Sequence, residues 1–193
     1  MHFIKLKNKF IFDASSLSTG DDTLMLSHGK VDYHNTSIPD DVRDMMYSVI
    51  PKEFHKFFNI YFISGNGILS PHVDNPSSCT ILFYNRPGNF RTSFYELENE
   101  NTEVLYSEVS NVSDEQLSQR KYIPNRVYKD EDIKKVGSYV AEPYDAWCLN
   151  GKTIHSVEPV DKTTESYRSA LILDTVDLTF KQVVALLRQT DSI

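Results

Sequence analysis

The segment that decides the fold is residues 146–176, AWCLNGKTIHSVEPVDKTTESYRSALILDTV. It contains three short runs of mainly β-branched, aromatic and other apolar residues: AWCLN, TIHSV and SALILDTV. An Asn-Gly pair and a polar stretch separate these runs. Apolar runs of this length that are bounded by turn residues are typical of β-strands. The segment therefore predicts three strands in succession.

Further runs of the same kind lie upstream, so that eight occur in total after residue 57. The other five are FNIYFIS, CTILFYN, RTSFYEL, TEVLYSEV and GSYVAE. Many short strands with Gly, Pro and Asn between them indicate a β-sandwich or barrel. We therefore expect a mainly β fold with flanking helices, in which the strands form a sandwich or a barrel.

Two segments show helical periodicity. In residues 37–50, SIPDDVRDMMYSVI, a proline and two aspartates occupy the expected first turn, and apolar residues recur at helical spacing. Its methionine stripe indicates core packing. In residues 178–189, LTFKQVVALLRQ, Thr179 can cap a helix with one apolar face, which we expect to pack within the chain.

The length of 193 residues fits a single domain. Its predicted parts are a helical and extended support over 1–58, a β-rich core over 59–176 and a C-terminal helix over 177–193. Residues 111–135 are polar and charged, and they predict a surface excursion or lid. The wider region 96–140 is rich in loop residues, and we expect it to help define a substrate pocket.

The composition is that of a folded globular protein, with 40% hydrophobic and 24% charged residues. The net charge of −7, without a cluster of Lys and Arg, disfavours nucleic acid as a partner. We find neither a signal peptide nor an apolar stretch of about 20 residues, so we expect a cytoplasmic protein that does not bind membranes. Cys79 and Cys148 lie in strand-like runs, and we expect buried thiols rather than a disulfide or metal ligands.

The motif His72-Val73-Asp74 lies between two prolines in the stretch SPHVDNPSS, residues 70–78. In extended chain, residues two apart project to the same side, so His72 and Asp74 can reach one point. Alone, this motif is a weak signal, because most such tripeptides consist of surface histidines and solvated acids. Further candidate ligands from another part of the chain are needed before a metal site can be inferred.

His155, in a strand after the Asn-Gly turn, is a further candidate ligand. Arg168 follows 13 residues later, at the start of an apolar strand, and is a candidate basic residue of the same site. Taken singly, His155 could be a core histidine, and Arg168 could be exposed or could pair with Glu158 or Glu165. A guanidinium in such a strand requires an anionic partner. Two histidines and one carboxylate on one face of a metal form the facial triad of non-haem Fe(II) oxygenases.

On these motifs the sequence resembles the Fe(II)/2-oxoglutarate-dependent dioxygenases, and among them the prolyl-hydroxylase-like group. The resemblance runs from about residue 59 to about residue 176, and it implies that this core over 59–176 is a double-stranded β-helix, a cupin-like jelly roll, with flanking helices. GNGILSPHVDNPSSCTILFYN is similar to the family's Gly-rich approach to its HxD motif and the strand that follows. VAEPYDAWCLNGKTIHSVEPV and YRSALIL resemble its last strands, with the distal histidine and then the basic residue.

The resemblance implies that His72, Asp74 and His155 hold Fe(II), and that Arg168 binds the far carboxylate of 2-oxoglutarate. Tyr84 is a candidate for a second hydrogen bond to that carboxylate, unless Phe83 takes the inward position. The family's tyrosine upstream of the Gly-rich approach falls on an isoleucine, Ile63, with a tyrosine two residues earlier. O₂ would be the oxidant, with ascorbate as a supporting reductant, and succinate and CO₂ would be co-products. Because the carboxylate ligand is present, hydroxylation is expected rather than halogenation.

The resemblance leaves the substrate open between a prolyl or other residue of a polypeptide and a free amino acid. An oxygenase that acts on nucleic acid is an alternative within the enzyme class. A jelly-roll module that binds a ligand or metal without turnover is an alternative outside it, and so is a cupin-like site for another metal. The sequence does not specify an oligomeric state.

Overall fold

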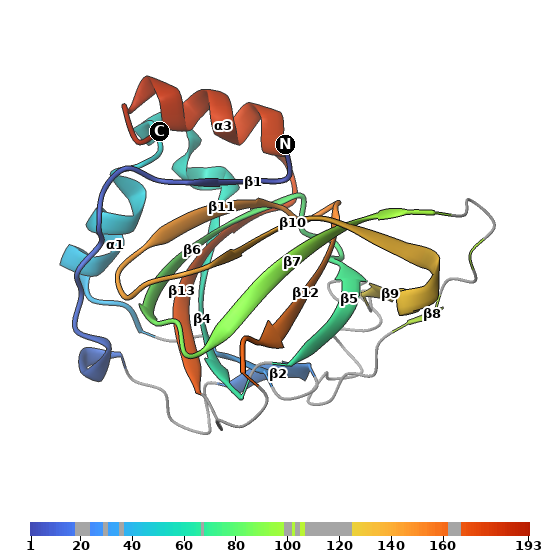
Figure 1. The fold of residues 1–193 in the computed structure, drawn as a ribbon. Coiled ribbons are helices and arrows are strands. Elements are labelled where there is room, and N and C mark those ends of the chain that lie inside the picture. The colour runs from blue at the N-terminus through green and yellow to red at the C-terminus, as the bar shows by residue number, and fades with distance from the viewer. Residues whose placement is uncertain are drawn as a thin grey trace.

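Two antiparallel β-sheets packed face to face form the body of the molecule (Figure 1). The computed structural model describes residues 1–17, 24–28, 31–34, 37–66, 68–98, 102, 105–106, 125–161 and 167–193. The part of the predicted excursion over 111–124 lies outside the described residues. Its remainder forms β9, the short helical turn η4 (Asp130–Asp132) and the start of β10.

One sheet has seven strands in the order β1-β11-β6-β13-β4-β3-β2. Its strands are β1 (Phe3–Lys5), β11 (Ala146–Asn150), β6 (Cys79–Arg86), β13 (Arg168–Thr175), β4 (Asn59–Gly65), β3 (Val31–His34) and β2 (Leu24–His28). The other has six strands in the order β10-β7-β12-β5-β9-β8. These are β10 (Ile133–Val140), β7 (Phe90–Leu97), β12 (Ile154–Pro159), β5 (Leu69–Val73), β9 (Arg126–Val127) and β8 (Leu105–Tyr106).

From β4 to β7 and again from β10 to β13, successive strands alternate between the two sheets. This alternation is the connectivity of a jelly roll. The predicted fold class, mainly β with flanking helices, is confirmed. Strands β2 and β3, which were not predicted from the sequence, extend the seven-stranded sheet beyond β4.

The flanking helices cover the outer face of the seven-stranded sheet (Figure 1). Both predicted helices are present, as α1 (Asp40–Tyr47) and α3 (Phe180–Gln189), and a shorter helical turn, η3 (Lys52–Phe57), follows α1. Thr179 and Gln182 form a capping box at the start of α3, a device that contributes about 1 kcal/mol. Val42 and Met46 of α1 are buried in the same core, so the predicted methionine stripe packs as expected.

Every residue of β13 from Arg168 to Thr175 is buried. This explains why the sequences of the central strands are continuous apolar runs. Leu171 and Leu173 face the helices, whereas Ala170 and Ile172 face the second sheet. A strand with both faces covered shows no polar alternation. Arg168 lies two residues before Ala170 and so on the side that faces the second sheet.

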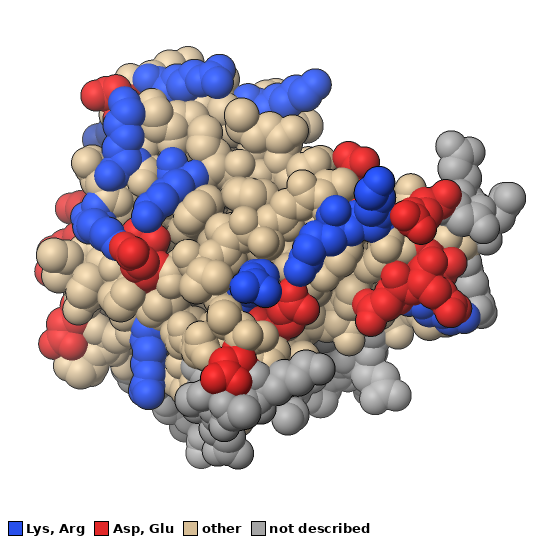
Figure 2. All heavy atoms as spheres, viewed as in Figure 1, with Lys and Arg blue, Asp and Glu red and all other residues tan. Residues whose placement is uncertain are grey.

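The surface carries both charge signs. On the face in Figure 2, Lys and Arg side chains are interspersed with Asp and Glu. None of the helices in the described part of the chain is long and apolar enough to cross a bilayer. Cys79 and Cys148 are buried free thiols, as expected, with their sulfur atoms 3.4 Å apart.

Candidate metal centre

His72, Asp74 and His155 converge at one end of the space between the sheets. His72 lies on β5, Asp74 directly follows that strand, and His155 lies on β12. Strands β5 and β12 are antiparallel neighbours, and their register places His155 directly opposite His72. One ligand atom from each of the three side chains lies within 4.8 Å of the others. This group of residues could hold a metal ion.

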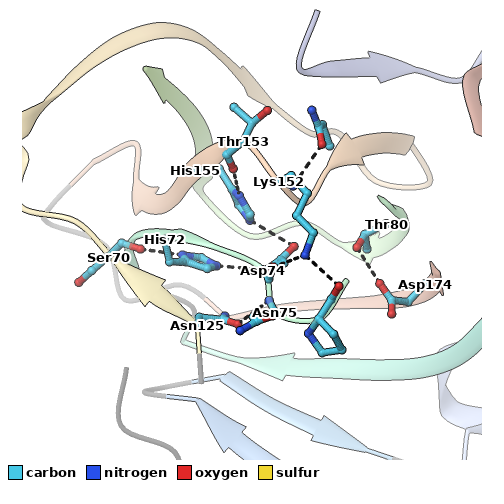
Figure 3. A network of polar contacts seen from close by, with 12 residues as sticks. Ser70, His72, Asp74, Asn75, Thr80, Asn125, Lys152, Thr153, His155 and Asp174 are labelled. Carbon is cyan, nitrogen blue, oxygen red and sulfur yellow. Dashed lines mark hydrogen bonds and ion pairs between the residues drawn. The ribbon is translucent and has the colours of Figure 1, made fainter. Parts of the chain in front are cut away.

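Backbone carbonyls orient both imidazoles (Figure 3). The Nδ1–H of His72 donates to the carbonyl of Ser70 at 2.7 Å, and the Nδ1–H of His155 donates to that of Thr153 at 2.9 Å. A carbonyl only accepts, so in each neutral ring the proton sits on Nδ1. The two Nε2 atoms then turn lone pairs toward Asp74, as a metal ligand requires.

Hydrogen bonds with the turn after β11 hold the loop that carries Asp74 in place. The Asp74 N–H donates to the carbonyl of Gly151 at 2.9 Å. The ammonium of Lys152 donates to the carbonyls of Asp74, at 3.1 Å, and Pro76, at 2.9 Å. A side chain at position 151 would have no room, because its Cβ would lie 2.9 Å from the carbonyl oxygen of Ser77. Gly151 thus permits the close approach of the two loops.

The protonation states suit a metal centre. Burial lowers the pKa of His155, and this outweighs the opposite effect of the Asp74 charge, so the ring is held in its neutral form. Burial by itself would raise the pKa of Asp74. Its contacts with His155 and His72, together with the nearby charge of Lys152, outweigh burial and bring the pKa below its usual value. A neutral His155 imidazole and an ionised Asp74 carboxylate are the forms in which these two groups bind a metal ion.

The spacing of the ligand atoms fits a divalent transition metal. Nε2 of His72 lies 3.4 Å from Oδ1 of Asp74, and Nε2 of His155 lies 3.7 Å from Oδ2. Metal bonds of about 2.1 Å at right angles hold neighbouring ligand atoms about 3 Å apart. A small inward movement of the three side chains would therefore suffice. Nitrogen ligands favour iron, zinc, copper or nickel over magnesium or calcium.

Arg168 is buried at the start of β13 with 4% of its surface exposed. Its guanidinium lies over the Phe90 ring at 5.9 Å, and within the described residues its Nε finds no hydrogen-bond partner. Glu158, one partner considered from the sequence, pairs with Lys135 at 2.9 Å, and Glu165 lies outside the described residues. A buried guanidinium with an unpaired donor is costly, and an anionic ligand would relieve that cost.

Tyr84 faces the space between the sheets, whereas Phe83 packs on the helix side, which answers the question of register. The Tyr84 hydroxyl lies 3.1 Å from that of Tyr139, which also hydrogen-bonds Thr92. Burial raises the pKa of Tyr139 well above its usual value, and the charge of Arg168 acts in the opposite direction. Tyr139 is therefore neutral, and the two hydroxyls form a polar patch within electrostatic range of Arg168.

Tyr139, Thr92 and Lys152 were not predicted from the sequence as residues of the site. Tyr139 and Thr92 lie in predicted strands, but their contacts depend on the pairing of β10 with β7, which places Tyr139 opposite Thr92. Strand alternation could have assigned their inward orientation once that register was known. Ile63 and Tyr61, the positions considered for an upstream tyrosine, both pack in the core between the sheets.

Comparison with known proteins gives no family. No protein-family model matches the chain, and no curated protein matches it at a significant level. The fold and the site themselves show a β-sandwich with a buried His-Asp-His group, and this group is consistent with a metalloenzyme.

Proposed function

We propose that this protein is an Fe(II)- and 2-oxoglutarate-dependent dioxygenase. It would hydroxylate an unactivated C–H bond of a prolyl or other residue in a polypeptide, or of a free amino acid. The observation that carries the proposal is the convergence of His72, Asp74 and His155 within 4.8 Å at one end of a jelly roll. Such a triad leaves three metal positions open for co-substrate and dioxygen.

The bound iron and 2-oxoglutarate would supply the oxidative chemistry, while the chain supplies charge, orientation and shelter from water. Asp74 and the two imidazoles are the iron ligands. Arg168 binds the far carboxylate of the keto acid through a charge-assisted contact, and Tyr84 adds a hydrogen bond, supported by its Tyr139 partner. The apolar core between the sheets excludes bulk water from the reacting groups.

A polypeptide or small molecule is the proposed substrate. The net charge of −7 suits a basic polypeptide, although solubility alone also explains it. For a nucleic-acid oxygenase we would expect clustered cations, and the interspersed charges in Figure 2 do not favour that alternative. The alternatives of a non-catalytic binding module and of a cupin-like site for another metal are separated by the experiments below.

The first experiment measures succinate in the absence of a substrate. Protein with Fe(II), ascorbate and 2-oxoglutarate should form succinate slowly, and His72→Ala should abolish the reaction. His55→Ala is the matched control, since His55 packs on Tyr47 and bonds the carbonyl of Ile50. If the wild-type protein formed no succinate and bound no keto acid, the result would favour the non-catalytic binding module. A mass-shift screen of peptides and amino acids for gain of one oxygen atom would then identify the substrate.

The second experiment tests Arg168. Calorimetry with the redox-inert Zn(II) form should show that Arg168→Met weakens 2-oxoglutarate binding about a hundredfold, the loss expected for a buried charge-assisted contact. Arg86→Met is the control, because the Arg86 guanidinium is stacked on the half-exposed Tyr167 at 5.5 Å. Equal keto-acid affinity in both variants would favour a cupin-like site for another metal, as would activity without succinate formation.

A further inference from the structure

The N-terminal strand β1 lies close to the candidate metal centre in space, although it is far from the three metal-ligand residues in the sequence. Phe3 pairs with Leu149 of β11, and Ile4 pairs with Cys148. The Phe3 ring turns into the space between the sheets, where it contacts Phe94 at 4.6 Å and Trp147 at 5.8 Å between ring centroids. Residues far apart in sequence thus meet beside β12.

The first link from this strand to the metal centre is a chain of rings. The Phe3 and Phe94 planes are inclined by only 23°. Phe94, which is fully buried, in turn stacks with His155, with centroids 6.0 Å apart and planes inclined by 28°. Since Phe94 and His155 are also direct partners across β7 and β12, the Phe94 ring limits the tilt of the imidazole.

The second link runs through the residue that orients His155. Nδ1 of His2 lies 3.3 Å from the hydroxyl of Thr153, and the carbonyl of His2 accepts from the N–H of Asn150 at 2.9 Å. The carbonyl of Thr153 is the acceptor for Nδ1–H of His155. His2 therefore supports the backbone on which the orientation of the imidazole depends.

Strand β1 is firmly attached, as a positioning element must be. Lys5 pairs at 2.9 Å with Asp145, whose side chain is fully buried, and the N–H of Leu6 donates to the carbonyl of Ala146 at 2.9 Å. Gly137 on β10 lies so close that a Cβ there would meet the Phe3 ring at 3.2 Å. The strand cannot shift without moving these contacts.

We propose that Phe3, with support from His2, is a positioning residue for His155 and that it sets metal affinity through Phe94 and Thr153. This inference rests on the proposed metal centre. Groups that orient metal ligands typically change metal affinity tenfold to a hundredfold when they are lost. Phe3→Leu keeps an apolar side chain in place but removes the ring that contacts Phe94.

The test measures Co(II) affinity by titration and the Co(II) absorption spectrum, which reports ligand geometry, alongside thermal unfolding. Phe10→Leu is the matched control. Phe10 follows in the same N-terminal segment and is as buried as a core residue, but it contacts Phe83 on the helix side of the sheet, at 5.0 Å. His2→Ala is a second variant, because His2 is partly exposed and its removal should leave the fold intact.

We expect Phe3→Leu to weaken Co(II) binding about tenfold and to alter the spectrum, His2→Ala to weaken binding by a smaller factor, and Phe10→Leu to change neither. Loss of affinity in step with loss of Tm in both Phe variants would overturn the proposal, since it would indicate general destabilisation. Unchanged Co(II) affinity in Phe3→Leu and His2→Ala would also overturn it, but would not contradict the proposed metal centre. A wild-type protein that binds no metal would overturn the proposed function as well.

Discussion

His72 and His155 face each other directly across β5 and β12, with their ring centroids 4.4 Å apart. A cross-strand pair at this spacing is fixed by the hydrogen bonds of the sheet rather than by loops. The ladder is irregular between His155 and Val157, just beyond the pair. Irregularities of this kind often occur beside active sites, where they redirect a side chain.

Metal should stabilise the folded protein, because the three side chains are brought together only by folding. At a free Zn(II) concentration of a hundred times Kd, the stabilisation should reach about 2.7 kcal/mol. Differential scanning fluorimetry should show this as a rise in Tm for the wild-type protein and for His55→Ala, and no rise for His155→Ala. A rise that persists in His155→Ala would place the bound metal elsewhere.

Gly151→Ala should damage the metal centre without touching a ligand. The new Cβ would meet the carbonyl of Ser77 at 2.9 Å and Oδ2 of Asp74 at 3.2 Å, so the Asp74 loop must move. We expect at least a tenfold loss of Zn(II) affinity and a loss of about 1–3 kcal/mol in the free energy of unfolding. Isothermal titration and urea unfolding measure the two. Wild-type affinity in this variant would show that the loop adapts.

The sequence predicts the parts of this architecture that depend on local signals. Helices α1 and α3 show apolar periodicity, a capping box precedes α3, and the central strand β13 is buried on both faces. The order of His72, Asp74 and His155 predicts a shared site because strands bring i and i+2 residues to one side. The structure does bring these side chains together.

Features that depend on register are not predictable in the same way. The inward orientation of Tyr84 follows from its pairing with Ala170 of β13, a partner 86 positions away, and the sequence offered Phe83 equally well. Strands β2 and β3 have weak β signals, and they join the sheet because β3 pairs with β4 and β2 pairs with β3. The partner of Glu158 is Lys135 because β10 and β12 both border β7.

The two thiols should be inert in the folded protein. Cys79 and Cys148 are fully buried, and burial together with the hydrogen bond to Cys148 raises the pKa of the Cys79 thiol well above its usual value. Because the thiolate is the reactive form, a disulfide-exchange reagent such as Ellman's reagent should not react under native conditions. It should titrate two thiols in guanidinium chloride. Fast native reaction would contradict the placement of these residues in the core.

Asp174 should make stability fall as pH rises. Burial raises the pKa of its carboxyl from 3.8 to about 6, against hydrogen bonds from Ser77 and Thr80, and the Asp74 charge adds to the increase. In the unfolded chain the group loses its proton near pH 4. Between about pH 4 and 6 the folded state therefore binds more protons than the unfolded state, and the stability due to Asp174 is lost across this window.

Asp174→Asn should remove this dependence while it keeps an acceptor for the hydroxyl of Thr80. A shift of about two pKa units corresponds to roughly 3 kcal/mol as an upper limit. Urea unfolding should therefore show the variant to be more stable than the wild-type protein at pH 8, with most of the advantage gone at pH 4.5. Asp177→Asn, at an exposed position just beyond β13, is the control and should change neither value. If Asp174→Asn were equally stabilising at both pH values, the carboxyl could not be titrating in this window, and its burial beside the Asp74 loop would not raise its pKa as described.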